Sequence, residues 1–211
     1  METEKLNVFD ENRNLVGIAT RAEVHKKGLW HETFHCWFVS HEEEKKYIFF
    51  QLRSNSKKDY PNLFDITAAG HILANESIAD GVREVEEEVG IKLSFNELVS
   101  LGEIKYSALQ GDLIDNELAN VFLYDYKKTM DDFLLQTEEV SGIVKADFES
   151  FSKLFTGKTD QLEVKGFEIN HVGEKTLLHT TVGKNSFVPH DDSYYEEIID
   201  RIKSHQNKVL R

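Results

Sequence analysis

The chain has 211 residues, of which 40% are hydrophobic and 11% are aromatic, so it is long enough to bury a substantial core. Its formal net charge is −13 and it contains no cluster of lysine or arginine, which argues against nucleic acid or an anionic membrane surface as its main partner. Cys36 is the only cysteine and cannot form an internal disulfide, and no apolar run approaches the length of a membrane span, about 20 residues.

The amino-terminal residues, Met1 to Lys5, show no signal-peptide pattern, and we expect a cytoplasmic protein. The two segments that follow, Leu6 to Phe9 and Leu15 to Ile18, flank a polar turn and predict a β-hairpin. A second predicted hairpin pairs Thr33 to Val39 with Lys46 to Arg53 across a charged turn. We place this second pair in the centre of a sheet, where the only cysteine would be a small core residue.

The rest of the chain predicts a mixture of strands and helices. Strands before and after a helix favour an α/β (α+β) fold in which a mixed sheet is covered by helices. The further predicted elements are strands at Leu63–Thr67, Leu98–Tyr106 and Ala119–Tyr126, a helix at Asp147–Phe155, a hairpin of Gln161–Asn170 and Lys175–Val182, and a helix at Tyr194–Lys203 that turns Ile198, Ile199 and Ile202 inward.

The chain shows no internal repeat and no low-complexity linker. We therefore expect a single domain over residues 1–211. Its amino-terminal hairpin would occupy about residues 1–26, and a hairpin plus helix would extend it over about residues 158–211.

The strongest chemical signal is a glutamate-rich helix that ends at Gly90. Carboxylates on one helix face raise one another's proton affinity unless a positive group lies among them, and a hard divalent cation fits best. A solvated charged face is the alternative, but such faces usually alternate in sign, and no lysine occurs between His71 and Ile91. At about 100° per residue, Ile78, Val82, Val85 and Val89 share an apolar stripe, and Glu84, Glu87 and Glu88 gather on the opposite face.

At these residues the sequence resembles the Nudix hydrolase family, whose box ends in Arg-Glu-apolar-x-Glu-Glu-x-Gly-apolar. Arg83 to Ile91 match that half at every specified position. Gly70 and Glu76 match the spacing of the first half, although six residues instead of seven separate Glu76 from Arg83. This many matches at fixed spacing make a specific signal.

The resemblance implies a Nudix-type α/β/α sandwich and a metal-dependent hydrolase of a diphosphate, such as a nucleoside diphosphate linked to another group. It implies that Glu84, Glu87 and Glu88 bind Mg²⁺ or Mn²⁺, and that Arg83 orients a glutamate through an ion pair. A small-molecule diphosphate would be the partner, and a homodimer is a common state in the family. The general base stays open between a box glutamate and the loop candidates Glu117, Glu138 and Glu139.

A second group of residues surrounds the predicted central strand: Arg21, His25, His31, His35 and His71. A lone histidine is more often a core or surface group than a ligand, but five basic or imidazole groups here favour phosphate binding. We list as candidate substrate-binding residues Arg21, His25, His31, Arg53, Gly70, His71 and Glu76.

The same histidines also resemble the entry segment of type I isopentenyl-diphosphate isomerases, which share the Nudix fold and use histidines and glutamates as metal ligands. In those isomerases a catalytic cysteine precedes the Gly-His pair, whereas this chain has Ala69 there. A methyl group can neither donate nor accept the proton that isomerisation requires. The sequence therefore favours an isomerase-like branch of the hydrolases. An isopentenyl-diphosphate delta-isomerase and a non-catalytic ligand-binding module remain as alternatives.

Overall fold

Strand β3 (Trp30–Glu42) is the central strand of the protein and pairs with four others in the computed structural model, which describes residues 3–111 and 113–209. It is antiparallel to β1 (Lys5–Phe9), β4 (Lys45–Arg53) and β6 (Ala68–His71). It is parallel to β8 (Leu113–Asp125), so the sheet is mixed, as predicted.

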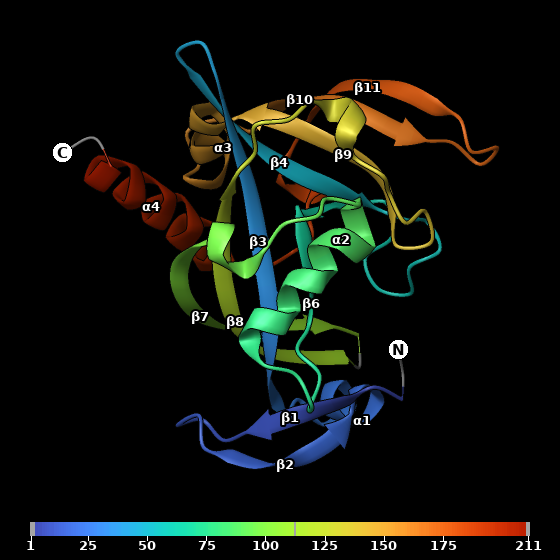
Figure 1. Ribbon diagram of the computed structural model, residues 1–211, viewed down its shortest axis with the longest axis vertical. Helices are drawn as coiled ribbons and strands as arrows, with labels where there is room; N and C mark the ends of the chain where they lie inside the picture. The colour runs from blue at the N-terminus through green and yellow to red at the C-terminus, as the bar shows by residue number, and fades with distance from the viewer. Residues whose placement is uncertain (1–2, 112, 210–211) are drawn as a thin grey trace.

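The remaining strands extend this sheet on both sides (Figure 1). The strand path runs β11-β10-β9-β4-β3-β1-β2, with β5 paired to β4 and β7 paired to β8. The carboxyl-terminal hairpin therefore continues the sheet that contains β3. The bounds are β2 Leu15–Thr20, β5 Phe64–Ile66, β7 Val99–Gln110, β9 Val140–Asp147, β10 Leu162–Ile169 and β11 Lys175–Val182, with helices α1 Arg21–Lys27, α2 Arg83–Val89, α3 Phe148–Phe155 and α4 Asp192–Val209.

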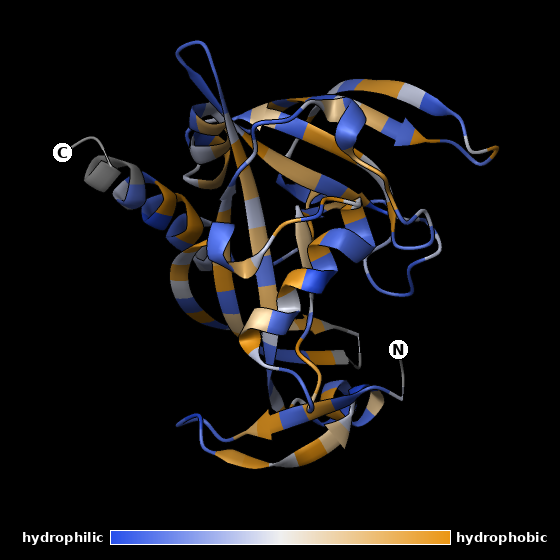
Figure 2. Ribbon diagram, in the orientation of Figure 1, coloured by the Kyte–Doolittle hydropathy of each residue, from blue (hydrophilic) through white to orange (hydrophobic). Residues whose placement is uncertain are grey.

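Alternation along β3 divides the core into two layers. Phe34, Cys36 and Phe38 face a cluster that also contains Val85 and Val89 of α2. Trp37 and Val39 point to the other side, where the apolar faces of α3 and α4 pack. In Figure 2 the central strands carry mostly hydrophobic colours, and the connecting loops are mostly hydrophilic. Helices on both faces of a mixed sheet give the predicted α/β/α arrangement.

The predicted hairpins, the two outer helices and the inward isoleucines are confirmed. Ile198, Ile199 and Ile202 are all buried, and Cys36 is a buried core residue. Three elements were not predicted: helix α1, the short strand β6 and strand β9. Strand β9 is buried between β4 and β10, so it lacks the alternation that reveals a half-exposed strand. No helix in the described part of the chain combines the length and apolar character that crossing a membrane requires.

The glutamate helix begins later than the sequence pattern suggested. Residues Ile78–Val82 form a 3₁₀ helix, and the regular α-helix starts only at Arg83. A 3₁₀ helix rises about 2.0 Å per residue and an α-helix about 1.5 Å. Glu76 and Arg83 meet across this 3₁₀ turn, although one residue fewer than in the family pattern separates them.

The close approach of β9 and β10 requires a glycine at position 166. A Cβ atom at this position would lie 1.9 Å from the carbonyl oxygen of Ile143, a backbone atom that cannot move independently. We expect Gly166→Ala to lower the free energy of unfolding by about 2 to 4 kcal/mol, measured by chemical denaturation. Gly17→Ala is the matched control, because its Cβ would meet no atom within 4 Å. Equal stability of the two variants would contradict this register.

Candidate active site

The box glutamates line a pocket of about 330 Å³ between α2 and the sheet. Glu84, Glu87 and Glu88 all reach it, although their exposures differ widely. Glu88 is buried beside Val85 and Val89, and the Glu84 side chain is only 13% exposed, whereas that of Glu87 is 54% exposed. Two of the three carboxylates thus belong to the buried floor of the site.

Arg83 holds the box together by contacting three glutamates. Its Nε and Nη2 atoms donate to the two carboxylate oxygens of Glu76 at 2.6 and 3.0 Å. Its Nη1 atom donates to Glu84 at 2.6 Å and to Glu87 at 3.1 Å. The guanidinium also reaches the carbonyl oxygen of His71 at 3.1 Å. Part of the positive charge that the carboxylates need therefore comes from the chain itself.

Glu76 is placed by this clamp and is not one of the residues that line the pocket. Besides Arg83, it accepts the backbone N–H of Leu73 at 2.9 Å. Both carboxylate oxygens are thus occupied by partners from the box, which makes Glu76 a positioning group in this arrangement.

Gly70 is needed because Glu84 packs directly against it. A Cβ atom at position 70 would lie 2.2 Å from the carboxyl carbon of Glu84. Strand β6 therefore approaches α2 closely enough for the neighbouring backbone N–H of Ala69 to donate to Glu88 at 2.9 Å. Gln51 of β4 donates a second hydrogen bond to the same carboxylate at 3.2 Å.

Burial has opposite consequences for acids and bases in this pocket. It raises the pKa of Glu84 to about 7 and that of Glu88 to about 8, and each carboxylate also repels its neighbours. Burial, together with the nearby His31, holds the pKa of His71 well below its usual range. In the metal-free protein near neutral pH, both glutamates are therefore partly protonated and His71 is neutral.

Three of the predicted histidines converge, and two of them, His25 and His71, line the pocket. His25 comes from α1, His31 from β3 and His71 from β6, and one nitrogen of each lies within 4.8 Å of the others. His31, Asp115 and Glu117 form a second such group, because the parallel register sets His31 opposite Glu117. Asp115 was not predicted, although its spacing of two from Glu117 on a strand places both on one face.

The chemistry of this histidine and carboxylate cluster fits a divalent cation. His31 donates from Nδ1 to the carbonyl oxygen of Leu29 at 3.1 Å, so its Nε2 atom presents a lone pair to the cluster. That Nε2 atom and the Oδ1 atom of Asp115 are both buried without a hydrogen-bond partner among the described residues. Neutral imidazoles and carboxylates are the forms that bind metals. The box glutamates form no comparably compact group among the described residues.

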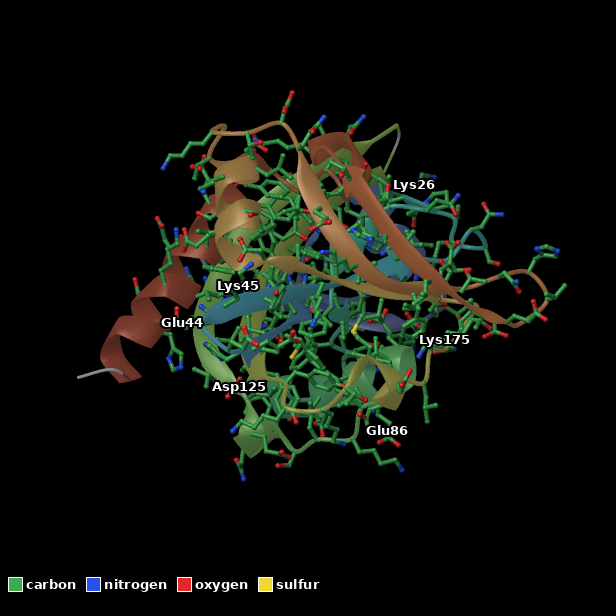
Figure 3. The ribbon with its side chains drawn as sticks, turned by 90° about the horizontal axis from the view of Figure 1, so that it is seen from above. Lys26, Glu44, Lys45, Glu86, Asp125 and Lys175 are labelled. Atoms are coloured by element: carbon green, nitrogen blue, oxygen red, sulfur yellow. The ribbon has the colours of Figure 1, made fainter. Side chains whose placement is uncertain are left out.

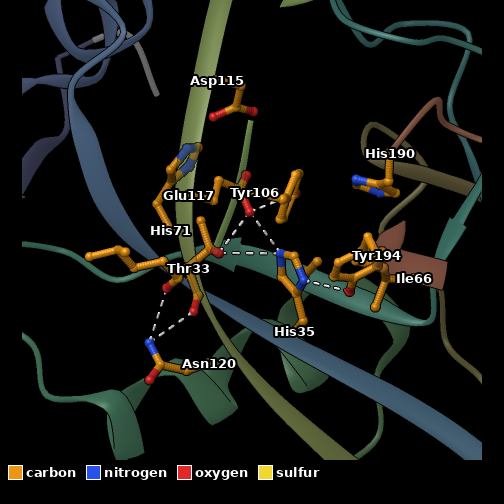
Figure 4. A network of polar contacts seen from close by, with 12 residues as sticks. Thr33, His35, Ile66, His71, Tyr106, Asp115, Glu117, Asn120, His190 and Tyr194 are labelled. Carbon is orange, nitrogen blue, oxygen red and sulfur yellow. Dashed lines mark hydrogen bonds and ion pairs between the residues drawn. The ribbon is translucent and has the colours of Figure 1, made fainter. Parts of the chain in front are cut away.

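Glu117 is fixed by a polar network that extends to the carboxyl-terminal helix (Figure 4). Its Oε2 atom accepts the hydroxyl groups of Thr33 and Tyr106, both at 2.8 Å, and lies 3.0 Å from Nε2 of His35. Nδ1 of His35 is 2.8 Å from the hydroxyl of Tyr194 on α4. Burial tends to raise the Glu117 pKa, but the hydrogen bond and charge of His35 outweigh it and hold that pKa well below its usual range.

The other predicted residues are distributed unevenly. Arg21 and Arg53 both line the pocket. Arg53 donates hydrogen bonds to the carbonyl oxygens of Asp59 and Tyr60 and to the carboxylate of Asp65. Among the loop candidates for the base, Glu139 lines the pocket and forms an ion pair with Lys57. Glu138 is exposed and does not line it.

The pocket as a whole is strongly acidic. Nine carboxylate side chains line it, against four from lysine and arginine. An anionic ligand would be repelled from such a surface unless cations entered with it. The lining residues that were not among the candidate site residues include Asp65, Tyr106 and His190. They come from three separate segments, and no local motif marks them.

Comparison with known proteins identifies the family. The chain is 41% identical over 199 residues to an uncharacterized Nudix hydrolase of Clostridium acetobutylicum, covering 94% of this chain and 97% of that protein. It is 31% identical over 176 residues to Nudix hydrolase 3 of Arabidopsis thaliana, covering 81% of this chain but 22% of the plant protein. An isopentenyl-diphosphate Delta-isomerase of Aliivibrio fischeri is 30% identical over 144 residues, covering 67% and 78%. No family model matches the chain.

Solved structures agree on the fold. A protein of Deinococcus radiodurans superposes with a TM-score of 0.55 at 15% identity, over 73% of this chain and 90% of that one. A MutT/nudix family protein of Enterococcus faecalis gives 0.55 at 13% identity, over 83% and 62%. The chain therefore belongs to the Nudix hydrolase family. It is an enzyme of that family, as the box predicted.

The raised pKa of Glu88 predicts a pH-dependent effect of its removal on the metal-free protein. The group has a pKa of about 8 in the fold against 4.5 when free, so folding disfavours its charged form. The associated stability is complete below about pH 4.5 and is lost as the pH rises toward 8. In a chelating buffer, Glu88→Gln should therefore raise the free energy of unfolding by about 1 to 3 kcal/mol at pH 8 and by less than about 1 kcal/mol at pH 5.

The matched control for this measurement is Glu86→Gln. Glu86 lies on the same helix but at the surface of the protein (Figure 3). It pairs there with Lys92. Its substitution should leave stability nearly unchanged at both pH values. A Glu88→Gln effect of the same size at pH 5 and pH 8 would show that burial does not govern this carboxylate.

Proposed function

We propose that this enzyme hydrolyses a small diphosphate with the help of Mg²⁺ or Mn²⁺. The observation that carries the proposal is that the box glutamates line the same acidic pocket as His25, His71, Asp115 and Glu117, four members of the cluster to which the buried His31 also belongs. When bound there, divalent cations would neutralise phosphate charge and activate water. The box would hold cations through Glu84, Glu87 and Glu88, and the cluster would hold one through its imidazole nitrogens and carboxylate oxygens.

The proton acceptor is best sought in the box. Glu84 lines the pocket, and its carboxylate accepts a hydrogen bond there from Arg83. Glu117 is a poorer base, because its pKa is low and one of its oxygens already accepts two hydroxyl groups. Glu139 is tied to Lys57, and Glu138 does not reach the pocket. Among the four, the geometry supports a box glutamate.

The pocket also favours a compact substrate. Its volume of about 330 Å³ is at the lower end of the range for small-molecule sites, about 300 to 1,000 Å³. Most of its lining residues are polar or charged, which suits a diphosphate group better than a long apolar chain. We therefore place the diphosphate between the two ligand clusters, with little room for a large second substituent.

Glu87 offers the most direct test of the box, because it is partly exposed and its removal leaves the core intact. We expect Glu87→Gln to lower metal-dependent turnover of a diphosphate substrate by about 100-fold, since it removes one charge that would hold the cation. The substrate would come from a screen of nucleotide sugars, dinucleoside polyphosphates, coenzyme A derivatives and isoprenoid diphosphates. Glu86→Gln, one residue away, should retain full rate. Undiminished turnover by Glu87→Gln would exclude the assignment.

An isomerase is the second candidate, because the histidine cluster and its similarity to the Aliivibrio fischeri protein favour it. Ala69 argues against it, because this residue lines the pocket and its methyl group cannot transfer a proton. Cys36 cannot substitute, since it is fully buried in the core on the face of α2.

Incubation of the metal-loaded enzyme with isopentenyl diphosphate separates the two classes. We expect no allylic isomer, detected by ¹H NMR in deuterated buffer, because the pocket-facing atom of residue 69 carries no transferable proton. Inorganic phosphate or a monophosphate would be the product if this compound is a substrate at all. Formation of the allylic diphosphate would overturn the hydrolase assignment.

A further inference from the structure

The connection between β11 and α4 brings the carboxyl-terminal extension back to the pocket. Phe187 forms an isolated parallel bridge with Phe64 of β5, and Val188 donates its N–H to the carbonyl oxygen of Phe64 at 2.8 Å. The hydroxyl of Tyr195 donates to the carbonyl oxygen of Val188 at 2.8 Å. These contacts fix the segment against the sheet, and His190, two residues on, lines the pocket.

His190 is held in one orientation by a buried carboxylate. Its Nε2 atom lies 3.0 Å from Oδ1 of Asp65, and the two side chains are only 9% and 6% exposed. Asp65 also accepts the N–H of Ile66 at 2.8 Å and Nη1 of Arg53 at 2.9 Å. Despite burial, the hydrogen bond to His190 and the charge of Arg53 hold the Asp65 pKa at about 2, so the carboxylate is ionised. An ionised acceptor requires that Nε2 carries the hydrogen.

The second ring nitrogen of His190 is therefore the one available to a ligand. Among the described residues, none forms a hydrogen bond with Nδ1. In Figure 4 the ring enters from the side opposite Asp115 and His71, with Tyr106 between them. Its centroid is 5.4 Å from the ring of Tyr106 and 5.0 Å from that of Tyr194. The imidazole thus packs against the rings of Tyr106 and Tyr194 while its Nε2 atom contacts Asp65.

The lysine and arginine side chains that line the pocket already contact protein acceptors. Arg83 holds the box glutamates, Arg53 holds backbone carbonyl groups and Asp65, and Lys57 pairs with Glu139. Arg21 lies 3.5 Å from Asp59, the loosest of these contacts. A diphosphate carries several oxygens that need hydrogen-bond donors beyond any bound cation. Few donors are left to supply them.

The attachment of this segment to the sheet does not depend on His190, because Phe187 and Val188 already pair with β5. The carboxylate of Asp65 fixes the Nε2 side of the His190 ring, and His190 lines the pocket.

We propose that His190, held by Asp65, forms a phosphate-binding subsite that the carboxyl-terminal extension contributes to the active site. Its Nδ1–H donates a charge-assisted hydrogen bond to an oxygen of the bound diphosphate. The proposal rests on the proposed function only in taking a diphosphate as the ligand. It assigns to the extension a part in substrate recognition that the box and the histidine cluster do not provide.

Inorganic pyrophosphate in the presence of saturating Mg²⁺ is the probe, and isothermal titration calorimetry measures its Kd. We expect His190→Gln to weaken binding by about 10-fold, because glutamine keeps a polar group but cannot carry the charge. His179→Gln is the matched control: His179 also pairs with a carboxylate, Glu163, but is 61% exposed on β11. Its Kd should stay within about 2-fold of the original.

Asp65→Asn provides the second variant. If the pair acts as a unit, Asp65→Asn should weaken pyrophosphate binding in the same direction, and the double variant should bind no worse than His190→Gln alone. Thermal unfolding of each variant shows whether it folds. Pyrophosphate affinity unaffected by His190→Gln, or no measurable binding to the unaltered protein, would overturn the subsite.

The test separates this inference from the proposed function. An enzyme that binds pyrophosphate through His190 but hydrolyses no diphosphate would retain the subsite and lose the hydrolase assignment. An enzyme that hydrolyses diphosphates equally well with His190→Gln, at unchanged KM and unchanged pyrophosphate affinity, would do the reverse.

Discussion

The site depends on the pairing of β3 along both of its edges. In its first half, β3 lies between β6 and the parallel strand β8. This places His31 opposite Glu117 and Thr33 opposite His71, so that imidazoles and carboxylates from three strands meet in one volume. A slip of one residue in either register would turn these side chains to the other face of the sheet. The buried aromatic residues that alternate with them, such as Phe34, make such a slip costly.

The second constraint is the concentration of negative charge. The pocket combines nine carboxylates with four basic side chains, and repulsion among the carboxylates destabilises the fold. Arg83 offsets part of this repulsion by contacting three glutamates at once. Burial adds to this cost, and burial is the main reason why the pKa values of Glu84 and Glu88 are raised. Divalent cations would relieve it, so stability and chemistry are coupled through the same side chains.

The carboxyl-terminal extension belongs physically to this site. Its hairpin continues the sheet next to β9, and α4 contributes Tyr194, whose hydroxyl contacts His35 and Trp37 beneath the cluster. The connecting segment adds His190 to the pocket wall. Residues more than 100 positions apart therefore share one hydrogen-bond network, which ties the geometry of Glu117 to a helix near the end of the described chain.

The sequence by itself determined the elements whose signals are local. Spacing on one helix identified Glu84, Glu87, Glu88 and their family, and alternation identified the half-exposed strands. The buried strand β9 and the short helix α1 were not predicted, because neither shows a clear hydrophobic periodicity over enough residues. The loop candidates for the base were not separable either, because their environments depend on distant residues.

Only the tertiary structure decided which residues share the pocket. Asp115, Asp65 and His190 lie on three segments with no common motif, and long-range pairing alone brings them to the histidines and the box. Only the tertiary structure shows that Glu76 pairs with Arg83, and that Glu84 packs against Gly70, where a larger residue would clash with it. The physical reason is that a periodic pattern reports one face of one element, whereas a site is made where faces of several elements meet.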